Sequence, residues 1–278
     1  MNFTYIDCLA DMDFLSEELK LKSVLGIDTE FRRTTKDNMK LALLQINDGE
    51  EIYLIDTIAI DYSEGCCDFL FSDDVVKIFH SFREDIEAIY SWTNKALRNV
   101  HDTQLAESFL GGNYSISYQD LVNNHLGFSI SKSETRSNWI RRPLTVSQLD
   151  YAASDVEFLI NIYEDQIFQL KNTPKAQWLD EEANFLIRES LSGEEKNIQQ
   201  PSILTKNQES FMLKDFNQTV EAISEEKNIN KTLLFSKKSQ KDFLRLYFYK
   251  GFEEAKNSIT SWRYLLLENQ LDRILDFE

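Results

Sequence analysis

Three strand-like runs lie near the start of this chain. They span residues 24–27, 41–46 and 52–55, and polar, turn-prone residues separate them. Between the second and third runs stands Asp48-Gly49, and Asp-Gly between two extended runs is typical of a β-hairpin. Short apolar or alternating runs bounded in this way indicate β-strands that bury one or both faces. We therefore expect the first third of the chain to form strands of a β-sheet.

Helical and extended patterns alternate after these runs. A strand is predicted at 75–79 and a short one at Val100, with helices at 82–92, 102–110 and 117–126. Residues 127–143 have little periodicity and are predicted to form a loop, and residues 146–170 a helix with an apolar stripe. This order predicts an α/β fold, a mixed sheet flanked by helices.

The last third of the chain is predicted to be helical. A connector helix near 175–192 precedes a polar stretch suited to a linker, and residues 203–278 are rich in helix formers that suggest four or five helices. A length of 278 residues fits one larger domain and a smaller partner. We divide the chain into a domain at 1–172, a connector at 173–200 and a small all-α domain at 201–278.

Composition excludes several classes of protein. Residues 1–169 hold 14 Lys and Arg against 29 Asp and Glu, so most of the net charge of −17 lies there, which argues against an unspecific polyanion binder. The three cysteines, Cys8, Cys66 and Cys67, indicate neither a disulfide framework nor a zinc site. The chain has no apolar run of about 20 residues and no signal-peptide pattern at its start. We expect a cytoplasmic monomer without membrane association.

Asp28 and Glu30 follow an apolar run and are two residues apart, so on a strand both carboxylates point to one face. Two acids at the end of a buried strand are costly unless a cation neutralises them, although a solvated strand end is the simpler explanation for the pair alone. Asp85 stands near the start of the helix after the 75–79 strand, where the helix dipole alone would favour an acid.

Tyr151 and Asp155 are four residues apart on the predicted 146–170 helix and so occupy one helix face. Taken alone, the pair is explained without a function, as a tyrosine at the edge of the core beside a solvent-exposed aspartate. Together, the four carboxylates and the phenol predict a site for two divalent cations that hydrolyses phosphodiesters. Carboxylate oxygens suit Mg²⁺ or Mn²⁺, and a phenol can orient the attacking water.

Four segments carry a resemblance to a known family. They are Gly26-Ile27-Asp28-Thr29-Glu30-Phe31, His80-Ser81 with Asp85, His101-Asp102-Thr103-Gln104, and Tyr151-Ala152-Ala153-Ser154-Asp155. In order and spacing these segments resemble the motifs of ribonuclease D. That family belongs to the exonucleases that are named for four acidic residues and a tyrosine. Residues 132–139 and Arg142-Pro143-Leu144 are similar to the loop before that family's last motif. The resemblance covers about residues 1–190.

The resemblance implies a ribonuclease-H-like fold and a 3′→5′ exoribonuclease that releases nucleoside 5′-monophosphates from tRNA precursors or other small structured RNA. It implies that Asp28, Glu30, Asp85 and Asp155 hold two Mg²⁺ or Mn²⁺ ions and that Tyr151 positions the water. Asp102 and Gln104 are expected to support the fold, and His80 to be packed or hydrogen-bonded. Two alternatives stay open: a 3′→5′ DNA exonuclease with the same chemistry, and a catalytically silent RNA-binding scaffold.

Bacterial members of the family usually carry two small helical domains, shared with certain helicases, after the catalytic domain. Residues 231–274 resemble the final helices of the second such domain, so a single helicase-and-RNase-D C-terminal (HRDC-like) domain is expected. Basic residues in two places are candidate RNA contacts, and solvated surface is the equal alternative for both. These candidates are Lys132, Arg136, Arg141 and Arg142 in the loop, and Lys237 and Lys238 in the C-terminal domain.

Overall fold

A computed structural model describes residues 2–35, 38–130, 137–192 and 203–275. Six strands form one sheet in the order β1-β4-β3-β2-β5-β6. The pairs β2–β3 and β3–β4 are antiparallel and the other neighbours are parallel, so the predicted mixed sheet is confirmed. The strands are β1 (Thr4–Ile6), β2 (Val24–Thr35), β3 (Asn38–Asn47), β4 (Ile52–Ile55), β5 (Val76–Phe79) and β6 (Val100–Asp102).

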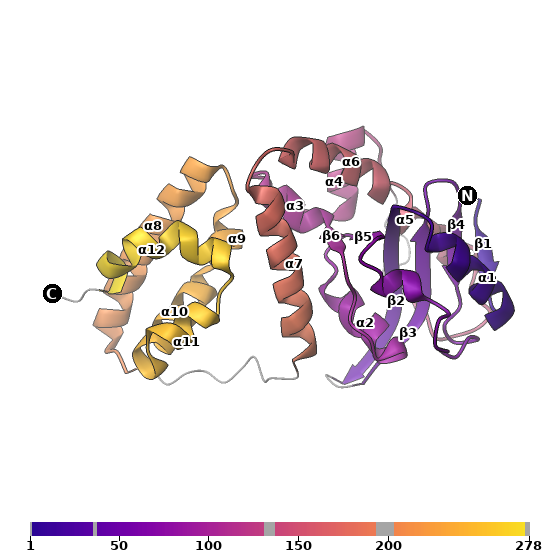
Figure 1. Ribbon diagram of the computed structural model, residues 1–278, viewed down its shortest axis with the longest axis horizontal. Coiled ribbons are helices and arrows are strands. Elements are labelled where there is room, and N and C mark those ends of the chain that lie inside the picture. The colour runs from indigo at the N-terminus through magenta and orange to yellow at the C-terminus, as the bar shows by residue number, and fades with distance from the viewer. Residues whose placement is uncertain (1, 36–37, 131–136, 193–202, 276–278) are drawn as a thin grey trace.

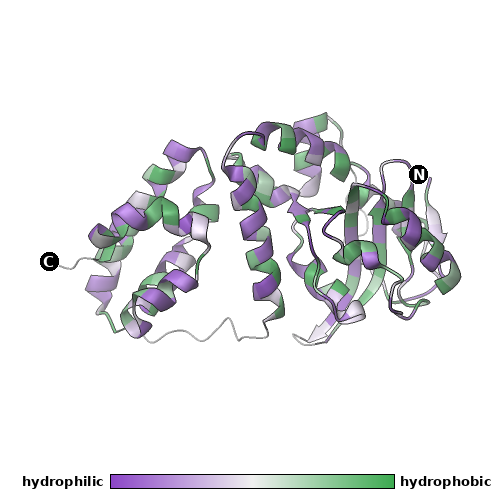
Figure 2. Ribbon diagram, in the orientation of Figure 1, coloured by the Kyte–Doolittle hydropathy of each residue, from purple (hydrophilic) through white to green (hydrophobic). Residues whose placement is uncertain are grey.

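Helices cover both faces of the sheet, as expected. Leu25 and Ile27 of β2 share one apolar cluster with α1 (Leu9–Leu19), α2 (Arg83–Thr93) and α7 (Lys175–Leu191). Ala42 and Leu43 of β3 share the other cluster with α4 (Tyr118–Leu126), α5 (Val146–Val156) and α6 (Leu159–Leu170). Successive strand residues point to opposite faces, so the even-numbered residues of β2 face α5 and α6. Figure 2 shows hydrophobic residues along the strands of the sheet, interspersed with hydrophilic ones.

Two predicted element boundaries are wrong. The strand that carries Asp28 continues to Thr35, because it pairs with β3 along the whole length of a hairpin. The predicted 146–170 helix is two helices, α5 and α6. Asn47 donates its side-chain Nδ2 to the carbonyl oxygens of Val156 and Glu157, and the backbone N–H of Phe158 donates to the Tyr118 hydroxyl. These side chains satisfy the backbone groups that a helix break would otherwise leave unpaired. Strand β1 and helix α1 were not predicted.

Residues 203–275 form five helices: α8 (Lys206–Lys227), α9 (Lys231–Phe235), α10 (Lys237–Lys250), α11 (Phe252–Asn257) and α12 (Ser261–Leu275). In Figure 1 helix α7 stands between these helices and the sheet. Trp262 of α12 is fully buried, with its ring 5.7 Å from that of Trp178 on α7 and 5.1 Å from that of Phe109. Phe109 ends α3 (Thr103–Phe109), a helix that packs on α6 and α7.

A buried ion pair supports the same contact. Glu182 of α7 accepts hydrogen bonds from the Arg263 Nη2, at 2.8 Å, and from the Trp262 Nε1, at 3.1 Å. One apolar cluster includes Leu25 of the sheet together with Trp262 and Ile274 of α12. Apolar contacts therefore link the sheet to the C-terminal helices through α7.

None of the helices within the described residues is long and apolar enough to cross a membrane.

Candidate metal centre

Three carboxylates meet between β2 and α5. Asp28 and Glu30 point to the same face of β2, and Asp155 lies on α5, which covers that face. Each of the three offers one oxygen, and these oxygens all lie within 4.8 Å of one another. Ala152 and Ala153 are fully buried, and their small side chains let α5 approach the sheet. The structure thus brings together three of the four predicted ligands.

Asp85 approaches from the other side of the strand. It is buried in the first turn of α2, and the Thr29 hydroxyl donates a hydrogen bond to its carboxylate. Thr29 points away from Asp28 and Glu30 because neighbouring residues on a strand alternate in direction. Asp85 is therefore outside the compact group of three, but its charge contributes to the rise of the Asp28 pKa.

Burial and mutual repulsion make this site reluctant to ionise. Removal from water is the largest cause in each case, and it raises the pKa of Glu30 to about 9 and the pKa values of Asp85 and Asp155 to about 7. The pKa of Asp28 is raised by burial and then by the charges of Asp85, Asp155 and Glu30. Clustered carboxyl oxygens with raised pKa values fit a divalent cation, because its charge offsets both causes.

Tyr151 lies one helical turn before Asp155 on α5, and a hydrogen bond from its side chain partly offsets the rise of the Asp155 pKa. Its ring centroid is 6.1 Å from that of Trp139, which is buried. The predicted pairing of Tyr151 with Asp155 on one helix face is present in the structure.

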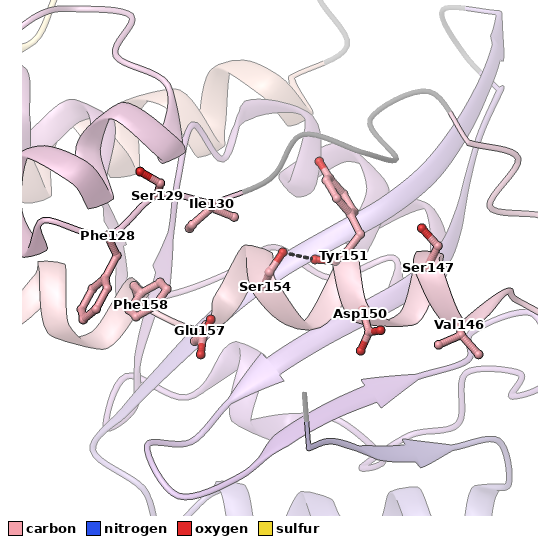
Figure 3. Close-up of a pocket in the computed structure, with 10 residues that line it drawn as sticks. All are labelled: Phe128, Ser129, Ile130, Val146, Ser147, Asp150, Tyr151, Ser154, Glu157 and Phe158. Atoms are coloured by element: carbon pink, nitrogen blue, oxygen red, sulfur yellow. Dashed lines mark hydrogen bonds between the residues drawn. The ribbon is translucent and has the colours of Figure 1, made fainter.

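A cavity of about 620 Å³ opens beside Tyr151 (Figure 3). Phe128 and Phe158 lie at its end with their rings stacked at 5.3 Å, and the Phe128 side chain is exposed. Sequence reasoning did not select these two phenylalanines. In the sequence, each is an aromatic residue close to a predicted motif. That feature does not distinguish a residue that lines a cavity from a residue in the core. The lining residues are Phe128, Ser129, Ile130, Val146, Ser147, Asp150, Tyr151, Ser154, Glu157 and Phe158.

The residues expected to support the fold do so. Asp102 caps the start of α3 by accepting from the backbone N–H groups of Gln104 and Leu105, and it also accepts from the Phe82 N–H. The Gln104 side chain donates to the Ile116 carbonyl. His80 is hydrogen-bonded to the Thr103 hydroxyl and lies within 3.1 Å of the Ile116 carbonyl oxygen.

The candidate RNA contacts in the loop have different outcomes. Lys132 and Arg136 lie outside the described residues, and Arg141 is exposed. Arg142 donates from Nε and Nη2 to both carboxylate oxygens of Asp56, at 2.6 and 2.7 Å. Its remaining N–H groups face the carbonyl oxygens of Ala42, Trp139 and Arg141. In this structure the Arg142 guanidinium is therefore engaged within the protein and has no N–H group left for a phosphate.

In the C-terminal helices, Lys237 and Lys238 are exposed at the start of α10. Two further basic residues of α10 are held by one acid. Arg245 Nε lies 2.6 Å and Lys241 Nζ 3.7 Å from the carboxylate of Glu209 on α8. Within α10, Lys237 and Lys238 at the first turn and Lys250 at the last turn are exposed.

Comparisons of the chain with known proteins agree on one family. Residues 3–169 match the family model described as 3′–5′ exonuclease. The chain is 35% identical over 180 residues to the ribonuclease D of Shewanella sp. (strain ANA-3), which covers 65% of this chain and 46% of that relative. It is 38% identical over 163 residues to the ribonuclease D of Xanthomonas oryzae pv. oryzae, 59% of this chain and 45% of the relative. The match thus spans about half the length of these curated relatives.

The fold of the whole chain also has a solved counterpart. The crystal structure of Escherichia coli RNase D, described as an exoribonuclease involved in structured RNA processing, matches with a TM-score of 0.65. That match covers 99% of this chain and 74% of the other, at 20% sequence identity. The likeness therefore extends from the sheet to the C-terminal helices.

Proposed function

This chain belongs to the 3′–5′ exonuclease family, and on that basis we propose that it is a metal-dependent 3′→5′ exoribonuclease of the ribonuclease D type. The single observation that carries this proposal is the meeting of Asp28, Glu30 and Asp155, each of which places one oxygen within 4.8 Å of the others in a half-buried, acidic site. A cluster of acids that repel one another needs a cation, and oxygen ligands suit Mg²⁺ or Mn²⁺.

In the proposed site Asp28, Glu30, Asp85 and Asp155 would together hold two divalent cations. When bound, two such cations activate a water and stabilise the leaving oxygen of an in-line displacement. Asp85 approaches from α2, and the hydrogen bond from the Thr29 hydroxyl fixes the orientation of its carboxylate.

Tyr151 is proposed to position the attacking water. Its position one turn before Asp155, beside an open cavity, allows the phenol to meet a water that approaches the scissile phosphate. A phenol can hold the water as a hydrogen-bond partner without adding charge to the site. The 3′-terminal residue would leave as a nucleoside 5′-monophosphate.

The cavity beside Tyr151 offers a place for a base next to the cleaved bond. The exposed ring of Phe128, supported by Phe158 behind it, is a flat surface on which any base can stack. Single-stranded ends suit such a surface because their bases are free to unstack. The substrates we propose are therefore tRNA precursors or other small structured RNA with single-stranded 3′ ends, met in the cytoplasm.

Residues 201–278 are proposed to form a single HRDC-like domain that grips RNA behind the site, with 1–172 as the exonuclease domain and 173–200 as the connector. Lys237 and Lys238 are exposed and stand on the least acidic part of the chain, so they suit phosphate contacts. Arg141 and the loop residues Lys132 and Arg136 stay as candidates for the same role.

The direct test uses one RNA labelled either at its 3′ end or at its 5′ end, digested with and without EDTA. We expect labelled mononucleotide only from the 3′-labelled RNA, and no release with EDTA. Asp155→Asn should abolish release, because it removes a charged ligand. A DNA strand of the same sequence is the parallel substrate. Equal cleavage of both would favour the DNA-active alternative, and no cleavage of either at saturating metal would favour the silent scaffold.

A further inference from the structure

Gln45 has a buried side chain without a partner. It lies on β3 and is fully buried, and neither its Nε2 nor its Oε1 has a hydrogen-bond partner among the described residues. Burial of an amide without hydrogen bonds is unfavourable, and folded proteins contain few such groups. The Gln45 amide therefore calls for a hydrogen-bond partner that it does not contact in this structure.

The strand register places Gln45 next to the acidic site. In the antiparallel pair β2–β3, Gln45 is directly opposite Asp28. Residues opposite one another in such a pair point to the same face, with their Cβ atoms about 4.5–5.5 Å apart. Asn47 lies two residues further on β3 and binds the last carbonyl oxygens of α5, which confirms that this face of β3 lies beneath the helix that carries Asp155.

The chemistry of the side chain suits this place. When an acid binds a cation through one oxygen, its other oxygen keeps lone pairs that need donors. An amide offers two N–H donors and no charge. A lysine or arginine would compete with the cation, and a further carboxylate would add repulsion to a site that already holds four.

We propose that Gln45 is a positioning residue for Asp28, which donates from Nε2 to the Asp28 oxygen that faces away from the cation and so fixes the carboxylate as a ligand. This inference rests on the proposed metal-dependent function. It extends the site by one residue that touches neither the RNA nor the reacting atoms.

The test measures Mn²⁺ binding to the full chain by isothermal titration calorimetry without RNA, and thermal unfolding of the metal-free protein. Gln45→Met keeps the length of the side chain and removes the amide. We expect its Mn²⁺ affinity to be about 10- to 100-fold weaker than that of the unaltered protein, the usual effect of losing a group that orients a ligand. The metal-free Tm should be unchanged or higher, because an unsatisfied buried polar group is removed.

Thr57→Val is the matched control. Thr57 follows β4, two strands from β2, and its hydroxyl is also buried and lacks a partner among the described residues. Its removal should leave Mn²⁺ affinity unchanged. A loss of affinity in both variants would mean that any change of this kind in the core disturbs the site, and would overturn the specific role of Gln45.

Other outcomes separate the two levels of the argument. Unchanged Mn²⁺ affinity in Gln45→Met overturns the role of Gln45 and leaves the metal centre standing. Failure of the unaltered protein to bind Mn²⁺, or binding by Asp155→Asn that is equally tight, overturns the metal centre and with it this inference. If Gln45→Met does not fold, the side-chain amide signals of ¹⁵N-labelled unaltered protein decide. Addition of Mg²⁺ must shift the Gln45 pair, and an unmoved pair contradicts the proposal.

Discussion

Tyr151 and Asp155 lie one turn apart on α5, and their chemistry gives them different tasks. Asp155 belongs to the group of carboxylates that fits a cation, whereas Tyr151 faces the cavity where a water and an RNA end would meet. A ligand and a positioning group should respond differently to substitution, because loss of the first removes metal and loss of the second leaves metal in place.

Tyr151→Phe removes only the hydroxyl. We expect kcat to fall by about 10²- to 10⁴-fold, the range for a lost acid–base or positioning group, while KM and Mn²⁺ affinity change little. Steady-state cleavage of a labelled RNA and calorimetric Mn²⁺ titration measure these quantities. Tyr90→Phe, which removes the hydroxyl of an exposed tyrosine on α2 outside that cavity, is the matched control and should keep its kcat. A Tyr151→Phe variant with full kcat would assign the phenol to packing against Trp139.

The raised pKa values predict how stability depends on pH. In the unfolded chain these carboxyl groups have pKa values of about 4, whereas in the folded protein the pKa values are about 7 for Asp85 and Asp155 and about 9 for Glu30. Between these limits the folded state holds more protons than the unfolded state, so stability falls as pH rises. With EDTA present, Tm should fall as pH rises from about 5 to about 9.

Two measurements check the origin of that fall. Saturating Mg²⁺ should reverse it at pH 8, because the cation takes the place of the lost protons. Asp155→Asn in EDTA should have a flatter profile and a higher Tm at pH 8, because one repelling charge is gone. A metal-free Tm that rises over this range would contradict the assignment of the carboxylates to a strained acidic cluster.

At the scale of elements, the site depends on how closely α5 and α6 approach β2. A Cβ added at Gly26 would lie 3.1 Å from the Leu159 Cβ and 3.4 Å from the Val156 carbonyl oxygen, both at the junction of the two helices. Gly26 thus lets the helix junction rest on the strand two residues before Asp28.

Gly26→Val tests this close approach. Valine has the higher strand propensity and would stabilise an open strand, but here we expect a loss of about 1–3 kcal/mol, typical of an overpacked core. Since the displaced junction carries Asp155, Mn²⁺ affinity should fall as well. Urea unfolding and Mn²⁺ titration are the measurements. Adding Leu159→Ala should restore part of both by making room, and a Gly26→Val protein as stable as the unaltered one would exclude a tight junction.

The helix junction also shows what the sequence could not predict. The apolar stripe of Val156, Leu159 and Ile160 continues through it without a Gly or Pro, so local pattern predicts one helix. The break is stabilised by Asn47 and Tyr118, which are distant in sequence. Arg142 is a second example. Its partner Asp56 is 86 residues away in the chain, so the local sequence does not reveal the ion pair and predicts an arginine that is available to phosphate.

Short-range regularities were the part that could be predicted. Alternation along a strand predicted that Asp28 and Glu30 point to one face. The i,i+4 spacing on a helix predicted that Tyr151 and Asp155 are neighbours. The approach of Asp85 from the opposite face of the sheet depends on how α2 crosses β2 and β3, which no local period encodes. Likewise, the sequence does not show that the Gln45 side-chain amide lacks a hydrogen-bond partner and lies opposite Asp28. Both facts require the strand register and the burial of the side chain.

At the scale of the whole molecule, Trp262 has the largest fully buried side chain among the described residues, and it joins the C-terminal helices to α7 and α3. We expect Trp262→Ala to cost about 3–5 kcal/mol, the usual range for removing a buried tryptophan. Urea unfolding monitored by circular dichroism measures this loss. Phe168→Ala, whose side chain on α6 is 77% exposed, is the control and should change stability by no more than about 0.5 kcal/mol. Equal stability of the two variants would show that the contact carries little energy.

The continuous core has a consequence for fragment complementation. Trp262 rests on Trp178, and Arg263 reaches Glu182, so residues from beyond position 203 complete a surface that the first 191 residues leave apolar. A chain cut between Leu191 and Leu204 should stay one particle in gel filtration. The two pieces, produced separately and mixed, should assemble and regain cleavage, whereas a C-terminal piece that carries Trp262→Ala should assemble poorly. The covalent link between the two halves would then be dispensable once the protein has folded.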